Sequence, residues 1–255
     1  MSAYKFLGAF VCIAALALGI SADGHDRGDM GRPMGMPLPE VEEPEGARCC
    51  LPDDQFRVLK GSMVSSTRTG FFGKLSGPTK IFEYSDNVYD YTNNKFASYI
   101  TRVLLDGSFY EEHVQVIENP DEDFVWVINL DEMKCMKGKK EEYPFRIGER
   151  CVPDYAMYSG AFYLGKEEFT ANEFYQIIPE DMSTSGLFTF SVSPDCIPHS
   201  ENFVGKTDSW GMSQILTVSS TFTNYTVGID MPEKYFTVPD YCRYMEESKP
   251  WWMPV

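Results

Sequence analysis

Few residues in this 255-residue chain have the types and spacing needed for catalysis. The three histidines are His25, His113 and His199, and no two of them have the helix or loop spacing of a zinc site. The sequence contains no Gly-x-Ser-x-Gly nucleophile elbow and no phosphate-binding glycine loop. A nucleophile and a histidine that meet only in space leave no local pattern. A hydrolase is therefore a remote alternative to a protein without enzymatic activity.

Carboxylates are the more informative groups. Residues 118–123 contain four acids, Glu118, Asp121, Glu122 and Asp123, together with one asparagine. Calcium binds about six to eight oxygens of this kind, but the run lacks the glycine and the distal glutamate of an EF-hand loop. A solvated acidic turn is the simpler interpretation. We expect weak calcium association with the acidic surface rather than one tight site.

The cysteines are best interpreted together with the N-terminus. Lys5 is followed by an apolar run at residues 6–20 that ends at Ser21-Ala22, the pattern of a secretory signal peptide over residues 1–22. The run is too short for a membrane span, which needs about twenty apolar residues. Cleavage would remove Cys12. Six cysteines would remain, and an even number in a secreted, extracellular chain predicts three disulfides: Cys49, Cys50, Cys135, Cys151, Cys196 and Cys242.

The net charge limits the partners that can be expected. It is −16 for the whole chain, which argues against nucleic acid and against docking on anionic lipid, and permits cationic partners, metal ions above all. No second long apolar run occurs, so we expect a soluble product that does not span a membrane. The sequon Asn224-Tyr225-Thr226 predicts a glycan on Asn224.

Residues 23–48 differ in composition from the rest of the chain. They hold five glycines and four prolines and no aromatic residue, so they cannot bury enough apolar surface to fold, and we expect a flexible leader. Arg27-Gly28-Asp29 within it spells an integrin-binding tripeptide, although a chance match is the simpler interpretation.

The chain from residue 49 to 255 has the pattern of one all-β domain. Short runs rich in Val, Ile, Thr, Tyr and Phe are separated by turn residues, as in a sandwich or barrel. Phe124–Ile128 is apolar throughout, so both faces should be buried. Lys166–Ile178 could be a helix or a strand. The other expected strands are Gln55–Val64, Thr79–Tyr91, Lys95–Leu105, Ser108–Ile117, Ala156–Leu164, Phe188–Ser193, Met212–Ser219, Phe222–Ile229 and Lys234–Val238.

Several motifs resemble the ependymin and ependymin-related family. They are Cys49-Cys50-Leu51-Pro52, Ile81-Phe82-Glu83-Tyr84, Cys196-Ile197-Pro198 and the closing run Tyr235–Cys242, in this order behind a signal peptide. The resemblance covers about residues 49–242, and the closing run and the Cys-Ile-Pro are its most specific parts.

The resemblance implies a fold and a function. The fold is a half-open β-sandwich of two stacked, curved antiparallel sheets with a deep apolar pocket, similar to bacterial lipoprotein carriers. Members of the family are described as calcium-binding, associated with cell–matrix adhesion and often dimeric. The resemblance also suggests the pairs Cys50–Cys196 and Cys135–Cys242, which would leave Cys49 with Cys151. The third of these pairs stays open.

The leading hypothesis is a secreted glycoprotein that binds a lipid, a fatty acid or another apolar small molecule. Aromatic residues at alternate strand positions could line its pocket or simply fill a core. A calcium-responsive matrix or adhesion protein is the main alternative, and a secreted hydrolase is the remote one. The resemblance also implies a homodimer as a partner state. The residues expected to point into the pocket are Tyr84, Tyr99, Trp126, Phe188 and Phe190.

Overall fold

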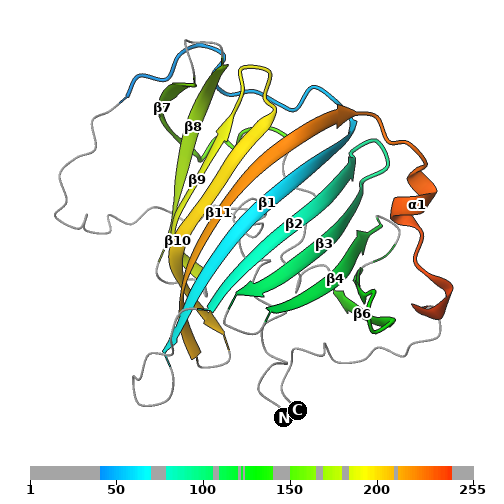
Figure 1. Ribbon diagram of the computed structural model, residues 1–255. Helices are drawn as coiled ribbons and strands as arrows, with labels where there is room; N and C mark the ends of the chain where they lie inside the picture. Colours follow the sequence, from blue (N-terminus) through cyan, green and yellow to red (C-terminus); the bar gives the residue numbers. More distant parts are fainter. Residues whose placement is uncertain are drawn as a thin grey trace.

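The computed structural model describes residues 41–69, 79–105, 109–119, 122, 124–139, 150–164, 169–179, 184–209 and 212–242. In these residues, eleven antiparallel strands form one strongly curved sheet in the order β6-β5-β4-β3-β2-β1-β11-β10-β9-β8-β7 (Figure 1). The strands are β1 Gln55–Thr69, β2 Thr79–Asp90, β3 Lys95–Leu105, β4 Phe109–Glu118, β5 Phe124–Asn129, β6 Lys134–Lys139, β7 Met157–Leu164, β8 Phe169–Ile178, β9 Thr184–Val192, β10 Pro198–Ser209 and β11 Met212–Val227. The expectation of an all-β fold is therefore confirmed.

The sheet has a covered inner face and a more open outer face, because side chains alternate along each strand. On β1, Phe56, Val58 and Val64 are buried on the inner face, each only 1% exposed. Met63 lies on the outer face and is 57% exposed, next to Phe82 of β2 in the ladder register.

The main core covers the inner face of β8, β9 and β10. Phe174, Phe188 and Phe203 are essentially fully buried there. Ala47 and Val152, from two segments that cross this face, complete the same cluster. Burying one aromatic side chain stabilises the fold by about 1.5–3 kcal/mol, so this cluster fixes the part of the sheet beside the candidate site.

Two glycines let β9 and β10 approach beside that core. Gly186 and Gly205 are direct partners in the ladder. A Cβ atom on Gly205 would lie 2.1 Å from the backbone oxygen of Ser185 and 2.4 Å from the Phe203 ring. Gly186 also has φ +148°, a backbone conformation that L side chains rarely adopt.

The C-terminal segment covers part of the outer face. Helix α1 (Pro232–Phe236) buries Tyr235 and Phe236 against Val88 and Ala97. The disulfide between Cys135 and Cys242 then anchors the following residues to β6. The apolar outer residues of β4 and β5 are thus covered as well, which explains why β5 is apolar throughout.

A charged cluster is buried on the inner face of β2, β3 and β4. Arg102 lies 2.9 Å from a carboxylate oxygen of Glu83 and 3.9 Å from one of Glu112, and the three side chains are 8–11% exposed. The amide of Asn129 donates a hydrogen bond to Glu112 at 3.1 Å. Charges in such a position need partners, since their desolvation is costly.

Several expectations about the elements need correction. The two stacked sheets implied by the resemblance are, among the described residues, one sheet with an unbroken ladder through β1 and β11. The two strands expected at Met212–Ser219 and Phe222–Ile229 are the single strand β11. The β1–β11 ladder contains a bulge at Asn224, where the register shifts opposite Arg57–Leu59 and Asn224 has φ 52°.

The structure also changes smaller predictions. Lys234–Val238 was predicted as a strand, but Pro232 begins helix α1, since proline suits the first turn of a helix. The ambiguous Lys166–Ile178 contains strand β8, and His199 lies in strand β10. Lys95–Leu105 has the predicted bounds. Its better buried face carries Phe96 and Ile100, whereas Ala97, Tyr99, Val103 and Leu105 lie on the outward face.

The predicted leader is described only from residue 41. Ala47 is buried, and the Arg48 guanidinium donates hydrogen bonds to the backbone oxygens of Pro153 at 2.6 Å and Ala156 at 2.7 Å. The last residues of the expected flexible leader are therefore part of the fold. The signal peptide and Arg27-Gly28-Asp29 lie outside the described residues.

Candidate functional site

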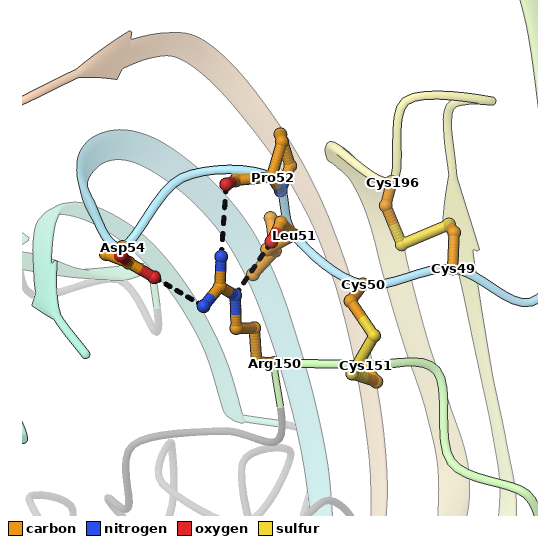
Figure 2. Close-up of a disulfide and its surroundings, with 8 residues drawn as sticks. All are labelled: Cys49, Cys50, Leu51, Pro52, Asp54, Arg150, Cys151 and Cys196. Carbon is orange, nitrogen blue, oxygen red and sulfur yellow. Dashed lines mark hydrogen bonds and ion pairs between the residues drawn. A yellow bond between two sulfur atoms is a disulfide. The ribbon is translucent and has the colours of Figure 1, made fainter. Parts of the chain in front are cut away.

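Two short segments cross the inner face, and we call them together the strap: residues 49–54 and 150–153. Backbone hydrogen bonds join them, from Leu51 N to Arg150 O at 2.8 Å and from Val152 N to Cys49 O at 2.9 Å. Disulfides Cys50–Cys151 and Cys49–Cys196 fix the strap to itself and to the turn before β10 (Figure 2). The strap is therefore covalently held over the sheet.

The observed pairing corrects the pairing suggested by the resemblance. Cys135–Cys242 is confirmed, but Cys49 and Cys50 exchange partners. The reason is the backbone pairing of the strap, which places Cys50 directly opposite Cys151. Neighbouring residues of an extended segment point in opposite directions, so Cys49 turns towards Cys196.

Arg150 stabilises the strap rather than offering a free charge. Its Nε donates to the carbonyl of Leu51 at 2.8 Å and its Nη2 to the carbonyl of Pro52 at 3.0 Å. Its Nη1 pairs with the carboxylate of Asp54 (Figure 2). All three nitrogen atoms of the Arg150 guanidinium therefore interact with other residues of the strap.

A small apolar cavity of about 110 Å³ lies between the strap and the inner face. Phe56 and Val58 of β1 and Phe190 and Val192 of β9 form much of its wall, and Leu51 of the strap contributes to its cover. The remaining lining residues are Tyr89, Tyr91, Arg150, Cys151, Val152, Pro153, Ser191, Cys196, Pro198, Ser200, Glu201 and Phe222.

Stacked aromatic rings make one side of this cavity rigid and uncharged. The Phe56 ring lies between those of Tyr89 and Tyr225, with centroid distances of 4.8 and 4.9 Å. Burial raises the pKa of Tyr89 well above its ordinary value of 10 and raises that of Tyr91 to about 12. These hydroxyls stay protonated at neutral pH, so they suit an apolar wall and do not supply a phenolate base or nucleophile.

A wider groove of about 510 Å³ adjoins the cavity. Val58, Pro198 and Phe222 line both spaces, so the two share a wall. Lys60 lies above the Phe222 ring, with Nζ 5.2 Å from its centroid, and pairs with Glu201 at 2.7 Å. The other residues of the groove are Phe169, Thr170, Ser193, Pro194, Asp195, Ile197, His199, Thr223, Asn224 and Tyr225.

The five predicted pocket residues do not come together. Phe190 lines the cavity, and Phe188 is buried in the adjacent core. Tyr84, Tyr99 and Trp126 lie on the outer face: Tyr84 is 44% exposed, Tyr99 donates to the backbone oxygen of Lys234, and Trp126 packs beneath the C-terminal segment.

Sequence reasoning missed Phe56, Val58 and Tyr89, although each lies in a predicted strand. The signal that could have identified them is the alternation of Phe56 and Val58 just after Cys49 and Cys50. Side chains at alternate positions point to the same face of a strand. Because the cysteines anchor the preceding segment, that face is expected to lie under the anchored segment.

The acidic turn holds no recognisable metal site in the described part of the chain. Glu118 is 6% exposed, and the carboxylate of Glu122 accepts a hydrogen bond from Trp126 Nε1 at 2.8 Å. Asp121 and Asp123 lie outside the described residues. Among the residues that are described, no group of three His, Cys, Asp or Glu side chains is placed to hold a metal ion.

The remaining predicted groups are dispersed. His113 is on the outer face of β4 with its Nδ1 3.0 Å from Asp131, and Asn224 is exposed at the bulge of β11. No helix within the described residues is both long and apolar enough to cross a membrane.

Comparison with known proteins gives one informative match. The Ependymin family model matches residues 110–242, a little over half of the chain. No curated protein matches the sequence.

Two solved structures show a distant likeness. A DUF1329 family protein from Desulfovibrio piger has a TM-score of 0.30 and 10% identity, covering 73% of this chain and 90% of its own. A β-barrel-like protein of the DUF1849 family from Brucella abortus has a TM-score of 0.26 and 7% identity, covering 69% of this chain and 99% of its own. No conclusion about function follows from likeness at this level.

Proposed function

The chain belongs to the ependymin family, and from that premise we propose that it is a secreted, non-enzymatic protein that binds an apolar ligand beneath the strap. The observation that carries the proposal is the apolar cavity with its disulfide-fixed cover. Ligand sites are typically concave, mostly apolar and largely preformed. The three disulfides suit an extracellular protein.

The size of the cavity indicates how a ligand would lie. A cavity of about 150 Å³ in another protein holds a molecule the size of benzene, and the cavity here is about 110 Å³. A lipid chain therefore needs the adjoining groove too. We propose that cavity and groove together form the deep pocket implied by the resemblance, since drug-sized sites span about 300–1,000 Å³.

A filling substitution at Val58 tests this proposal, because Val58 lines both spaces. We expect Val58→Phe to weaken uptake of a fluorescent fatty acid on the order of tenfold. Val204→Phe is the matched control: the same change on the outer face of β10, at a side chain that is 55% exposed. Circular dichroism would confirm that both variants are folded.

Lipid extraction completes the test. Protein purified from its native source would be extracted with organic solvent, and the extract examined by mass spectrometry. A protein that repeatedly yields no lipid and takes up no fatty acid, with Val58→Phe and Val204→Phe indistinguishable, would overturn the proposal.

A second copy of the chain is the partner we propose for the outer face. The exposed apolar side chains of the adjacent strands β1, β2, β10 and β11 include Met63 at 57%, Phe82 at 44%, Val204 at 55% and Ile215 at 54%. Exposed apolar patches of this kind favour association. Light scattering should show a dimer that Met63→Glu and Ile215→Glu convert to a monomer. A monomeric native protein would contradict this proposal.

Calcium association and matrix adhesion, the alternative function, remain predictions. They depend on the acidic character of the sequence, with its charge of −16. Millimolar calcium should raise the melting temperature if the ion binds the folded state preferentially. An unchanged melting temperature and an unchanged association state would count against this function.

A further inference from the structure

The groove beside the apolar cavity differs from it in chemistry. Its described lining contains the polar side chains of Ser193, His199 and Thr223, next to apolar ones such as Phe169 and Phe222. A site with one apolar and one polar compartment matches an amphiphile rather than a hydrocarbon.

The charges in the two linings disfavour an anionic head group. Asp195 is the one formally charged side chain in the described lining of the groove. In the cavity, Arg150 is paired within the strap and Glu201 is paired with Lys60. No unpaired basic side chain of the described linings is therefore placed to receive a carboxylate, while Asp195 would repel one.

His199 offers a specific polar contact. Its ring packs against those of Phe162 and Phe169, with centroid distances of 5.9 and 4.9 Å. Its Nδ1 atom is buried and makes no hydrogen bond to the described residues. A buried polar atom without a partner is costly, and a ligand hydroxyl that reaches this atom from the groove would satisfy it.

The shared wall connects these compartments. Val58, Pro198 and Phe222 line both the cavity and the groove. An acyl chain whose end lies in the cavity would therefore continue into the groove, where His199 and Asp195 can meet its head group.

We propose that the ligand is a neutral, hydroxyl-bearing amphiphile, of the kind represented by a monoacylglycerol, with the end of its chain in the cavity and the rest of the chain and its hydroxyl groups in the groove. The site then discriminates against the fatty-acid carboxylate of equal chain length. This inference rests on the proposed function and adds the chemistry of the head group.

Calorimetric titration of the full protein with monolauroylglycerol and with laurate, both below their micellar concentrations, tests the proposal. We expect the monoacylglycerol to bind about fivefold more tightly, the upper range for one partly exposed charge. His199→Phe keeps an aromatic ring between Phe162 and Phe169 but removes the nitrogen atoms. It should weaken monolauroylglycerol about three- to tenfold, as for one lost hydrogen bond, and leave laurate unchanged.

A charge reversal provides the second arm. Asp195→Lys should shift the preference towards laurate, and Asp195→Asn should do so less strongly and without a change of size. Glu132→Lys is the control for net charge, since Glu132 lies in the turn between β5 and β6 and lines neither space. Should Asp195→Lys fail to fold, Asp195→Asn carries the comparison.

The outcomes separate the two proposals. Laurate binding as tightly as monolauroylglycerol, or a preference that moves equally in Glu132→Lys and in the Asp195 variants, overturns the head-group inference but leaves the apolar site intact. A protein that binds neither compound overturns both.

Discussion

Replacing Arg102 by methionine tests how the sheet holds charge in its interior. The guanidinium lies 2.9 Å from Glu83 and 3.9 Å from Glu112, and all three side chains are at most 11% exposed. Removing one member of a buried ion pair costs about 3–5 kcal/mol, because the remaining charge is desolvated without compensation. We therefore expect Arg102→Met to lower the free energy of unfolding by about 3–5 kcal/mol at about pH 7.5.

Acidification should recover part of this loss. Burial raises the pKa of the Glu112 carboxyl above its ordinary 4.5, and Arg102 opposes that rise. A carboxyl with a higher pKa in the folded state binds protons more strongly there, so its destabilising effect is absent below the unfolded pKa and grows as the pH rises to the folded pKa. Without Arg102 the folded pKa rises further, and the penalty extends to higher pH.

Urea unfolding of both proteins at about pH 5 and pH 7.5 measures the effect. Lys134→Met is the control, because Lys134 and Glu132 pair at 2.6 Å with side chains 62% and 51% exposed, and such a surface pair contributes less than about 1 kcal/mol. Adding Glu83→Gln and Glu112→Gln to Arg102→Met should restore most of the stability. A loss no larger than that of Lys134→Met, or one that does not shrink at low pH, would refute the reasoning.

Three further predictions follow from individual features. Gly205→Ala should lower the free energy of unfolding by about 1–3 kcal/mol, because the added Cβ overpacks against Ser185 and Phe203. Gly61→Ala is the control, with no atom within 4 Å of the added Cβ, and should change the stability by less than about 0.5 kcal/mol. Equal effects of the two substitutions in urea unfolding would contradict this prediction. Removing Cys135–Cys242, which spans 107 residues, by paired alanine substitutions should lower the unfolding free energy by about 4–5 kcal/mol in the chain-entropy model, and a loss below about 1 kcal/mol would count against it. Protein secreted by eukaryotic cells should carry a glycan on the exposed Asn224. Intact mass spectrometry should show that Asn224→Gln and Thr226→Ala both remove the glycan mass. A native protein with the mass of its bare polypeptide would show that the sequon is unused.

The strands were largely predictable because their apolar residues alternate. Lys95–Leu105 was predicted with its observed bounds, and Phe124–Ile128 with both faces buried. Strand β10 was missed because Pro198–Ser209 is mostly polar. Its strand conformation is stabilised by backbone pairing with β9 and β11. Such tertiary contacts leave no pattern in the local sequence.

The site was harder to predict than the strands, because it depends on which face of each strand turns inward. Tyr84 and Tyr89 lie in the same strand, but they point to opposite faces, and only Tyr89 reaches the cavity. A shift of one residue reverses every such assignment. The exchange of partners between Cys49 and Cys50 has the same origin, because adjacent residues face opposite sides.

The neighbouring cysteines of the strap also determine what proteolysis can do to this protein. Cys49 and Cys50 join one point of the chain to positions 196 and 151. A peptide bond cut anywhere between residues 51 and 150 would leave both fragments covalently attached through Cys50–Cys151. Such a nicked molecule would keep its mass, plus one water, under oxidising conditions and separate only after reduction. A cut in this stretch therefore leaves the strap attached to the sheet through its disulfides.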